Sequence, residues 1–190
     1  QQLHEMLKYA VRSGYISVNP ADMVEPPRRD TKEAAFYELK DCRKLLTALD
    51  NFDDIQWRLF FSMSIYTGMR PGELIGLNWS DINGQILTVN AGFVQLHGQK
   101  SVRTDRPKTK KSVRMIDLPK EITVLLKKHK KEQAKYRLKF GKKWPEPDAV
   151  FTNDLGERLN KYAPSKHWNR FVKKNGLRKI PLYGLRHTAA

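Results

Sequence analysis

Apolar residues recur at the spacing of a helix face in several stretches of this 190-residue chain. In the longest stretch, from Glu121 to Phe140, apolar and uncharged residues fall on one face and lysines fill the opposite face. An apolar stripe of this kind predicts a helix that packs on a core through one side. Shorter stretches predict further helices at residues 1–12, 37–49, 54–67, 71–77 and 161–174.

Strand signals lie mainly between these helices. Asn83-Gly84 is a strong signal for a tight hairpin turn, and it predicts strands at residues 79–83 and 85–90. Further strands are predicted at residues 93–96, 112–118 and 150–152. The order of the elements predicts an α+β fold that is mainly helical, with a small antiparallel sheet on one side of the helical bundle.

Proline and glycine divide the chain into two parts. Between Gly14 and Asp30 these residues recur, so the segment cannot stay helical and is suited to a linker. We therefore assign residues 1–30 to the end of one domain and residues 31–190 to a second domain. The helix at residues 1–12 starts without a capping residue, which is expected of the last part of a longer helical element.

The junction between two of the predicted helices presents an arginine. Gly68 suits the left-handed conformation that ends a helix, and Pro71 suits the first turn of the next helix. Arg70 is therefore held at a place where a guanidinium and free helix N–H groups suit an oxyanion, most often a phosphate. Glu73 either orients Arg70, favours the helix N-terminus, or does both. The alternative is an ordinary helix–turn–helix corner with a surface arginine.

The chain carries a strong excess of positive charge, with 36 Lys and Arg against 20 Asp and Glu and a formal net charge of +16. Residues 97–114 carry +6 and residues 127–143 carry +8. Charge of this density predicts a polyanionic partner such as DNA. For the second window, DNA contact and a merely solvated helix face are equal alternatives. The candidate contacts in the first window are Lys100, Arg103, Arg106, Lys110, Lys111 and Arg114.

Composition excludes several classes of protein. Cys42 is the only cysteine, so the chain has neither a disulfide framework nor a thiolate metal cluster. No stretch is long and apolar enough for a signal peptide or a membrane span, and no group of carboxylates resembles a Mg²⁺ site. We therefore expect a soluble, cytoplasmic protein without a metal or a membrane partner. His97 and His129 are expected at the edge of the core or on the surface.

Three motifs, in their order along the chain, resemble the catalytic domain of a tyrosine recombinase of the phage-integrase type. The motifs are the segment 67–81 around Arg70, Lys108-Thr109 ahead of a strand that ends in Leu-Pro, and Leu185-Arg186-His187-Thr188. Residues 9–20 resemble the last helix and the linker of the core-binding domain that precedes this catalytic domain in the family. The resemblance spans nearly the whole chain, and three ordered motifs are far more specific than any one of them.

The resemblance implies a function and a set of roles. The function is site-specific recombination, the integration or excision of a mobile element or prophage, by cleavage and rejoining of double-stranded DNA through a 3′-phosphotyrosyl intermediate. Arg70 and Arg186 would neutralise charge on the non-bridging phosphate oxygens. Lys108 would protonate the leaving oxygen, with Lys110 and Lys111 as rivals for this role. No metal or cofactor is implied, and the bacterial or phage-encoded protein would act as a tetramer on DNA.

Two features depart from the family pattern. Tyr183 stands where the family usually has histidine, and a tyrosine, with a pKa of ~10, would only donate a neutral hydrogen bond. None of the seven tyrosines occupies the place of the family's nucleophile, which lies further on, so we expect a truncated chain that is inactive by itself. His187 is expected to brace its helix rather than touch the substrate. The alternatives are a non-enzymatic DNA-binding module and, with less support, a phosphatase or nuclease.

Overall fold

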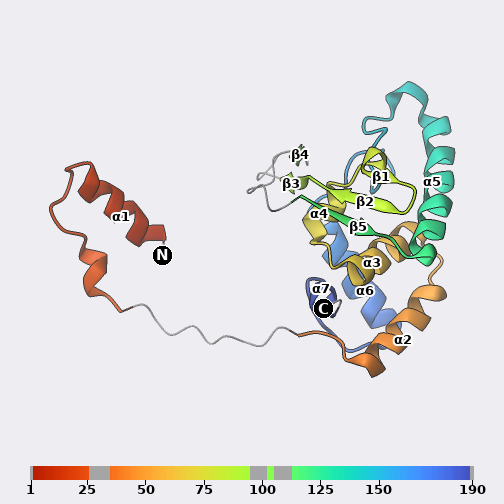
Figure 1. The fold of residues 1–190 in the computed structure, drawn as a ribbon, viewed down its shortest axis with the longest axis horizontal. Coiled ribbons are helices and arrows are strands. Elements are labelled where there is room, and N and C mark those ends of the chain that lie inside the picture. The colour runs from red at the N-terminus through yellow and green to blue at the C-terminus, as the bar shows by residue number, and fades with distance from the viewer. Residues whose placement is uncertain (1, 26–34, 95–101, 105–112, 189–190) are drawn as a thin grey trace. The chain divides into compact units, whose positions relative to one another are not determined.

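The computed structural model describes residues 2–25, 35–94, 102–104 and 113–188, and it separates the chain into two compact units, Gln1–Glu33 and Ala34–Ala190 (Figure 1). The first unit contains helix α1 (Gln2–Arg12) and the short 3₁₀ helix η1 (Pro20–Met23). The side chain of Asn19 caps η1 by accepting a hydrogen bond from the backbone N–H of Ala21, and His4 of α1 contacts Asp22 at 2.6 Å. The assignment of this unit to a core-binding domain stays a prediction.

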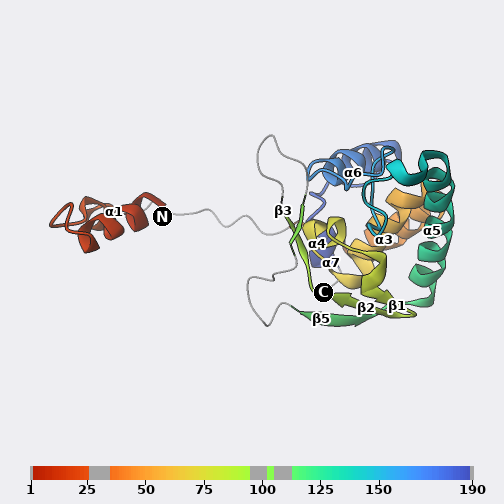
Figure 2. The same ribbon diagram turned by 90° about the horizontal axis from the view of Figure 1, so that it is seen from above.

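The second unit combines helices with two small antiparallel sheets, which confirms the predicted α+β fold. Its helices are α2 (Leu39–Asp50), α3 (Ile55–Thr67), α4 (Pro71–Ile75), α5 (Lys120–Phe140), α6 (Ala163–Lys174) and α7 (Gly184–Thr188), with the 3₁₀ helices η2 (Trp79–Asp81) and η4 (Gly141–Lys143). Its strands are β1 (Ile82–Asn83), β2 (Ile86–Val89), β3 (Gly92–Val94), β4 (Val102–Thr104) and β5 (Arg114–Asp117). One sheet has the order β1-β2-β5 and the other pairs β3 with β4. Figure 2 shows the three-stranded sheet along one side of the helices.

Helix α3 lies at the centre of the core. Asp54 caps its amino end by accepting a hydrogen bond from the backbone N–H of Trp57 at 3.1 Å, and Gly68 ends it with a φ of 59°. Trp57 and every residue from Leu59 to Ser64 are buried, because α2, α5, α6 and α7 all pack against this helix. A helix that is apolar on all sides is typical of such a central position.

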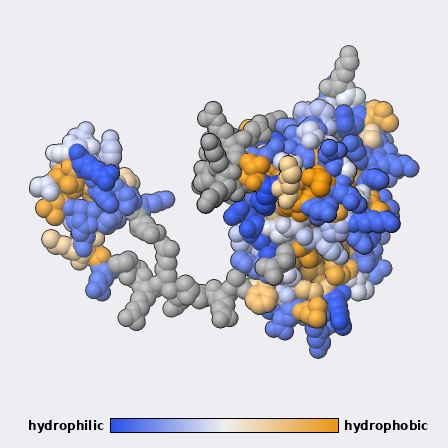
Figure 3. All heavy atoms as spheres, viewed as in Figure 1, coloured by the Kyte–Doolittle hydropathy of each residue, from blue (hydrophilic) through white to orange (hydrophobic). Residues whose placement is uncertain are grey.

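The long helix α5 packs through one face only. Its buried residues are Ile122, Leu125, Leu126, His129 and Gln133, and its lysines are exposed. This is the amphipathic pattern predicted from the sequence. Figure 3 shows mainly hydrophilic side chains over the side of the second unit where α5 lies, and small groups of exposed hydrophobic side chains across the face drawn.

The three-stranded sheet contributes alternate residues to the core. In the antiparallel pair β2–β5, Leu87 lies opposite Ile116 and Val89 lies opposite Arg114. Leu87 and Val89 are buried, whereas Met115 is exposed on the other face. The register therefore fixes the position of Arg114 at one end of the sheet.

Four sequence-based expectations need correction. Residues 79–81 form η2 instead of a strand, because the Asp81 carboxylate accepts a hydrogen bond from the backbone N–H of Asn78 and turns the chain. Residues 150–152 make only the isolated bridge Thr152–Arg158, since side chains, not a neighbouring strand, take up the carbonyls of residues 149 and 150. His129, which was expected at the edge of the core or on the surface, is one of these partners and is buried. Strand β4 was not predicted, because it lies within the basic window.

Candidate active site

The turn between α3 and α4 holds Arg70 in a defined conformation. Arg70 is the N-cap of α4, with φ −68° and ψ 145°, and Pro71 is the first residue of the helix. The Glu73 carboxylate accepts hydrogen bonds from the backbone N–H of Arg70 at 2.8 Å and from its Nη1 at 3.0 Å. Glu73 therefore caps the helix and orients the guanidinium at once. Because α4 has only five residues, the arginine, and not a helix dipole, is the main source of positive charge here.

Glu73 has a second arginine partner that the sequence did not reveal. Nη1 and Nη2 of Arg114 on β5 donate to the two carboxylate oxygens of Glu73 at 3.2 and 2.8 Å. The Glu73 side chain is 13% exposed, against 55% for Arg70, so the carboxylate lies beneath an accessible guanidinium. Burial would raise the pKa of the Glu73 carboxyl, but hydrogen bonds from Arg114 and Arg70 hold it below its usual value. Glu73 in turn raises the pKa of Arg70.

Helix α7 brings the second arginine to the same turn. The Arg186 guanidinium donates a hydrogen bond to the carbonyl of Gly68, two residues before Arg70. The other end of α7 is fixed by Thr188, whose hydroxyl accepts from the backbone N–H of Tyr37 at 3.0 Å. Leu185 is fully buried and α7 packs on α3. The two arginines of the first and third motifs, 116 positions apart by their numbers, are thus held at one turn.

Tyr183 and His187 lie at the same place. Their rings form an edge-on pair with centroids 5.3 Å apart. The pKa of Arg70 is raised mainly by Glu73 and, to a smaller extent, by the Tyr183 side chain. Tyr183 is half-exposed. The structure therefore gathers Arg70, Glu73, Tyr183, Arg186 and His187 around the ends of α3, α4 and α7.

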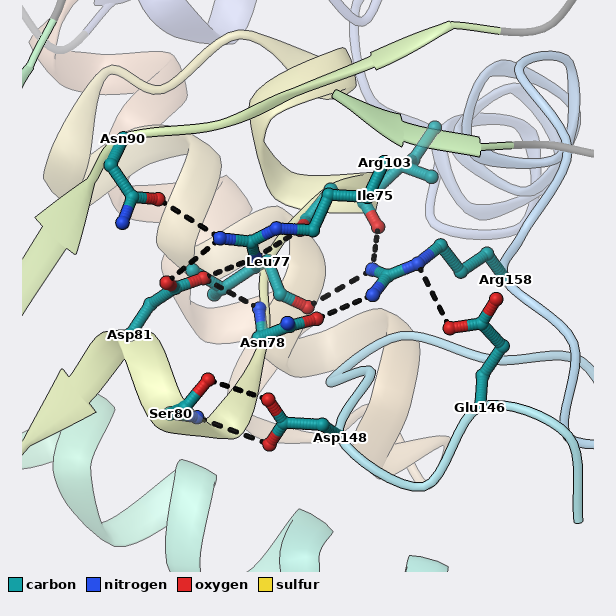
Figure 4. A network of polar contacts seen from close by, with 11 residues as sticks. Ile75, Leu77, Asn78, Ser80, Asp81, Asn90, Arg103, Glu146, Asp148 and Arg158 are labelled. Atoms are coloured by element: carbon teal, nitrogen blue, oxygen red, sulfur yellow. Dashed lines mark hydrogen bonds and ion pairs between the residues drawn. The ribbon is translucent and has the colours of Figure 1, made fainter. Parts of the chain in front are cut away.

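Arg103 has a position that the charge pattern did not predict. Its guanidinium donates to both carboxylate oxygens of Asp81, at 2.6 and 3.0 Å, and to the carbonyl of Gly76 and the side chain of Asn90 (Figure 4). The side chains of Arg103 and Asp81 are only 14% and 7% exposed. A carboxylate as buried as Asp81 needs a counter-charge, and Arg103 supplies it. This arginine holds β4 to the body of the unit, and we leave it out of the proposed DNA contacts.

A second buried arginine, Arg158, was not singled out from the sequence. It donates to the carbonyl of Ile75 at 3.1 Å and to the side chain of Asn78, and its Nε lies 3.4 Å from Glu146 (Figure 4). Burial lowers its pKa. Arg158 thus ties the segment after α5 to the carboxyl end of α4. No sequence signal distinguishes it from the many exposed cations.

The remaining candidates lie outside the described residues. They are Lys100, Arg106, Lys108, Lys110 and Lys111. In the described ranges, no group of three or more His, Cys, Asp or Glu side chains is arranged to hold a metal ion. Within those same ranges, no helix combines the length and the apolar character needed to cross a membrane.

Comparison with known proteins identifies the family. The model of the phage integrase family matches residues 36–190, which include every site residue described above. The chain belongs to the phage integrase family. This confirms the resemblance seen in the three motifs, and the match extends over nearly the whole second unit.

Relatives of this family member are recombinases and integrases. It is 27% identical over 206 residues to a XerC-like tyrosine recombinase of Caldanaerobacter subterraneus subsp. tengcongensis, covering 99% of this chain and 52% of the relative. It is 26% identical over 189 residues to the ICEBs1 integrase of Bacillus subtilis, covering 98% of this chain and 50% of that protein. The chain therefore spans about half the length of the curated relatives it matches.

Solved structures share the fold. The Tn1549 transposon integrase in complex with transposon right end DNA matches with a TM-score of 0.74 at 18% identity, covering 98% of this chain and 62% of that chain. A lambda integrase dimer bound to a COC′ core site matches with a TM-score of 0.63 at 18% identity, over the same shares of the two chains. At this identity the likeness establishes the fold alone.

Proposed function

We propose that this chain forms the arginine-bearing part of the catalytic domain of a site-specific DNA recombinase that integrates or excises a mobile element. The observation that carries the proposal is the convergence of Arg70 and Arg186 on one turn, with Tyr183 beside Arg70. Membership of the phage integrase family supports it. So does the similarity in sequence to a XerC-like tyrosine recombinase and to the ICEBs1 integrase.

The proposed reaction needs positive charge at a phosphodiester. A tyrosine hydroxyl oxygen attacks the phosphorus, the bond to the 5′-oxygen breaks, and a 3′-phosphotyrosyl link forms while the 5′-oxygen leaves with a proton. Negative charge grows on the non-bridging oxygens, which two arginine forks neutralise well. Rejoining is the reverse attack by the 5′-hydroxyl, so the energy of the broken bond is kept in the covalent intermediate.

Each site residue that the structure describes has a role in this proposal. Arg70 is exposed enough to reach a phosphate while Glu73 holds its orientation. Arg186 binds the phosphate from the side of α7, and His187 braces that helix through Tyr183. Tyr183 donates a neutral hydrogen bond to a phosphate oxygen, where the family usually has histidine.

Further parts of the proposal concern groups outside the described residues. Lys108 protonates the leaving 5′-oxygen. The nucleophile is a tyrosine other than the seven in this sequence, so we propose that the 190-residue chain binds DNA but does not cleave it by itself. In the complete protein we propose a tetramer on double-stranded DNA in the bacterial cytoplasm.

Covalent trapping tests the proposal. The complete protein is incubated with a nicked duplex carrying its own recombination junction, and protein–DNA adducts are measured on denaturing gels. We expect an adduct with the wild type and a rate lower by about 10²–10³-fold for Arg70→Ala and for Arg186→Ala. Arg58→Ala serves as the control, because that arginine pairs with Asp50 at the carboxyl end of α2 and makes no described contact with the site residues. An adduct that maps to Tyr183 or Tyr162, or no adduct with the wild type, contradicts the proposal.

A sulfur substitution tests the role of Lys108. A 5′-bridging sulfur leaves as a stable thiolate and needs no proton. We expect Lys108→Ala to slow cleavage of the ordinary substrate by about 10²–10⁴-fold, and we expect the sulfur substrate to restore most of that loss. Arg70→Ala should not be rescued, since Arg70 holds non-bridging charge. Rescue of Lys110→Ala or Lys111→Ala instead would assign the proton transfer to that lysine.

A further inference from the structure

One carboxylate serves two arginines at the candidate site. The Glu73 carboxylate accepts hydrogen bonds from the backbone N–H and Nη1 of Arg70, at 2.8 and 3.0 Å. It also accepts from Nη1 and Nη2 of Arg114, at 3.2 and 2.8 Å. The three side chains together carry one net positive charge. The side chain of Arg70 is the more exposed of the two arginines, at 55% against 33% for Arg114.

From this arrangement we infer that Arg114 is a positioning residue, which neutralises Glu73 so that the carboxylate can orient Arg70 without cancelling its charge. The inference rests on the proposed function and assigns to Arg114 a role through Glu73, where the charge pattern alone predicted a direct DNA contact. It requires no contact between Arg114 and the substrate.

The geometry separates the two tasks of Glu73. Its bond to the backbone N–H of Arg70 fixes the turn, and its bond to Nη1 fixes the guanidinium. The Glu73 side chain is 13% exposed in the structure, and without Arg114 it would keep Arg70 as its remaining arginine partner in the described contacts. The pair would then be neutral, and Glu73 would compete with a phosphate for the same N–H groups, because guanidinium forks bind carboxylate and phosphate alike.

The sheet makes Arg114 suitable for this task. Its backbone is paired with Val89 in the β2–β5 ladder, and Val89 is buried. Both Nη atoms donate to Glu73, so one N–H of each terminal nitrogen is occupied inside the protein. A residue fixed at both its backbone and its guanidinium positions its partner with little freedom, which is what preorganisation of a charge-stabilising group requires.

Single-turnover cleavage in the complete protein tests the inference, because it separates DNA affinity from the rate of the chemical step. The substrate is the nicked duplex with the protein's own junction, and the variants are Arg114→Met, Arg114→Lys, Glu73→Gln and the double variant. Arg58→Met is the matched control, since Arg58 also makes a two-pronged contact with one acidic residue, Asp50, and its side chain is 25% exposed.

We expect Arg114→Met to lower the maximal cleavage rate by about 10²-fold, the effect of misplacing a reacting group by about 1 Å, while the DNA dissociation constant and its salt dependence stay unchanged. Arg114→Lys keeps the charge and should recover much of the rate. Glu73→Gln should slow the wild type, which loses the orientation of Arg70. The same change should speed Arg114→Met, which gains back the charge of Arg70.

The opposite pattern overturns the inference. If Arg114→Met weakens DNA binding, reduces the magnitude of the negative slope of log K against log salt by about 0.9 and leaves the maximal rate as in the wild type, then Arg114 binds a phosphate directly. An unchanged rate and affinity also overturns it. Where Arg114→Met fails to fold, as shown by its melting curve, Arg114→Lys and the double variant decide. If wild-type protein does not cleave, the proposed function fails, whereas cleaving wild type with an unaffected Arg114→Met rate refutes the inference alone.

Discussion

His129 is a buried histidine whose charged form the fold disfavours. It is 4% exposed, and its ring lies against Phe151 with 5.9 Å between centroids. Its Nε2 lies 2.7 Å from the carbonyl oxygen of Val150 and therefore carries the hydrogen, because a carbonyl only accepts. Burial lowers the pKa of His129, and the hydrogen bond to Val150 opposes this only in part.

Because the pKa of His129 is lowered in the folded state, we expect the protein to lose stability in mild acid. Below about pH 6.5 the unfolded chain takes up a proton that the folded state excludes, so the free energy of unfolding should fall as the pH is lowered from 7 toward 5, by up to about 1.4 kcal/mol per pH unit for one histidine. Urea unfolding at several pH values measures it. His129→Gln should reduce the slope, and His167→Gln should reduce it further, since burial also lowers the pKa of His167. An equal slope in all variants would contradict the prediction.

The residues of the candidate site were foreseeable to different degrees. Arg70 and Glu73 lie three positions apart at a turn marked by glycine and proline, so their contact follows from local geometry. Arg186 was found through its motif. The pairing of Arg103 with Asp81 and of Arg114 with Glu73 was not predictable, because each joins residues far apart in sequence and nothing local separates a buried arginine from an exposed one.

Helix α4 and strand β3 approach so closely that a single methyl group should matter. A Cβ at Gly76 would lie 2.6 Å from the carbonyl oxygen of Gly92, a backbone atom that cannot move alone. We expect Gly76→Ala to destabilise the second unit by about 1–3 kcal/mol, the usual cost of overpacking, because β3 must shift away from α4. Thermal or urea unfolding measures the loss.

Gly72 provides the matched control within the same helix. A Cβ at Gly72 meets no atom within 4 Å, so Gly72→Ala should be neutral or stabilising by up to about 1 kcal/mol through helix propensity. Equal stabilities of Gly76→Ala and Gly72→Ala would show that α4 and β3 separate without cost.

Elements with a clear period were predicted, and those shaped by side-chain contacts were not. The helices α2, α5 and α6 follow from their one-sided apolar patterns, α3 follows from a continuous apolar run, and the Asn83-Gly84 turn follows from its residues. Residues 79–81 and 150–152 have strand-like sequences, but the Asp81 side chain bonds the backbone N–H of Asn78, and the side chains of His129 and Gln133 bond the carbonyl of Val150. Such competition between side chains and ladder hydrogen bonds leaves no mark on hydrophobic periodicity.

For the whole molecule, the charge predicts a steep salt dependence of DNA binding. If about six to eight phosphates are neutralised, log K should fall with log salt at a slope of about −5 to −7 for this chain and a short duplex, as measured by fluorescence anisotropy. A flat response would remove the basic windows from the interface.

The structure separates α5, which carries most of the second window, from β4, which is a described part of the first window. In Figures 1 and 2, α5 lies on the side of the second unit away from β3, with α4 between them. We therefore expect Lys127→Gln with Lys131→Gln to leave the slope within about 0.5 of the wild type, whereas Lys110→Gln with Lys111→Gln should reduce its magnitude by about 1.8. Equal reductions would place α5 in the DNA interface.

The contacts that fix α7 also set the order in which the second unit matures. The hydrogen bonds from Tyr37 to Thr188 and from Arg186 to Gly68 span 151 and 118 positions, so both wait until nearly all of the unit has been synthesised. Contacts of such separation form late, after α3 and the sheet have their local partners. A nascent chain on the ribosome therefore carries Arg70 for a time without Arg186, and the two arginines of the proposed phosphate site come together only after α7 has been synthesised.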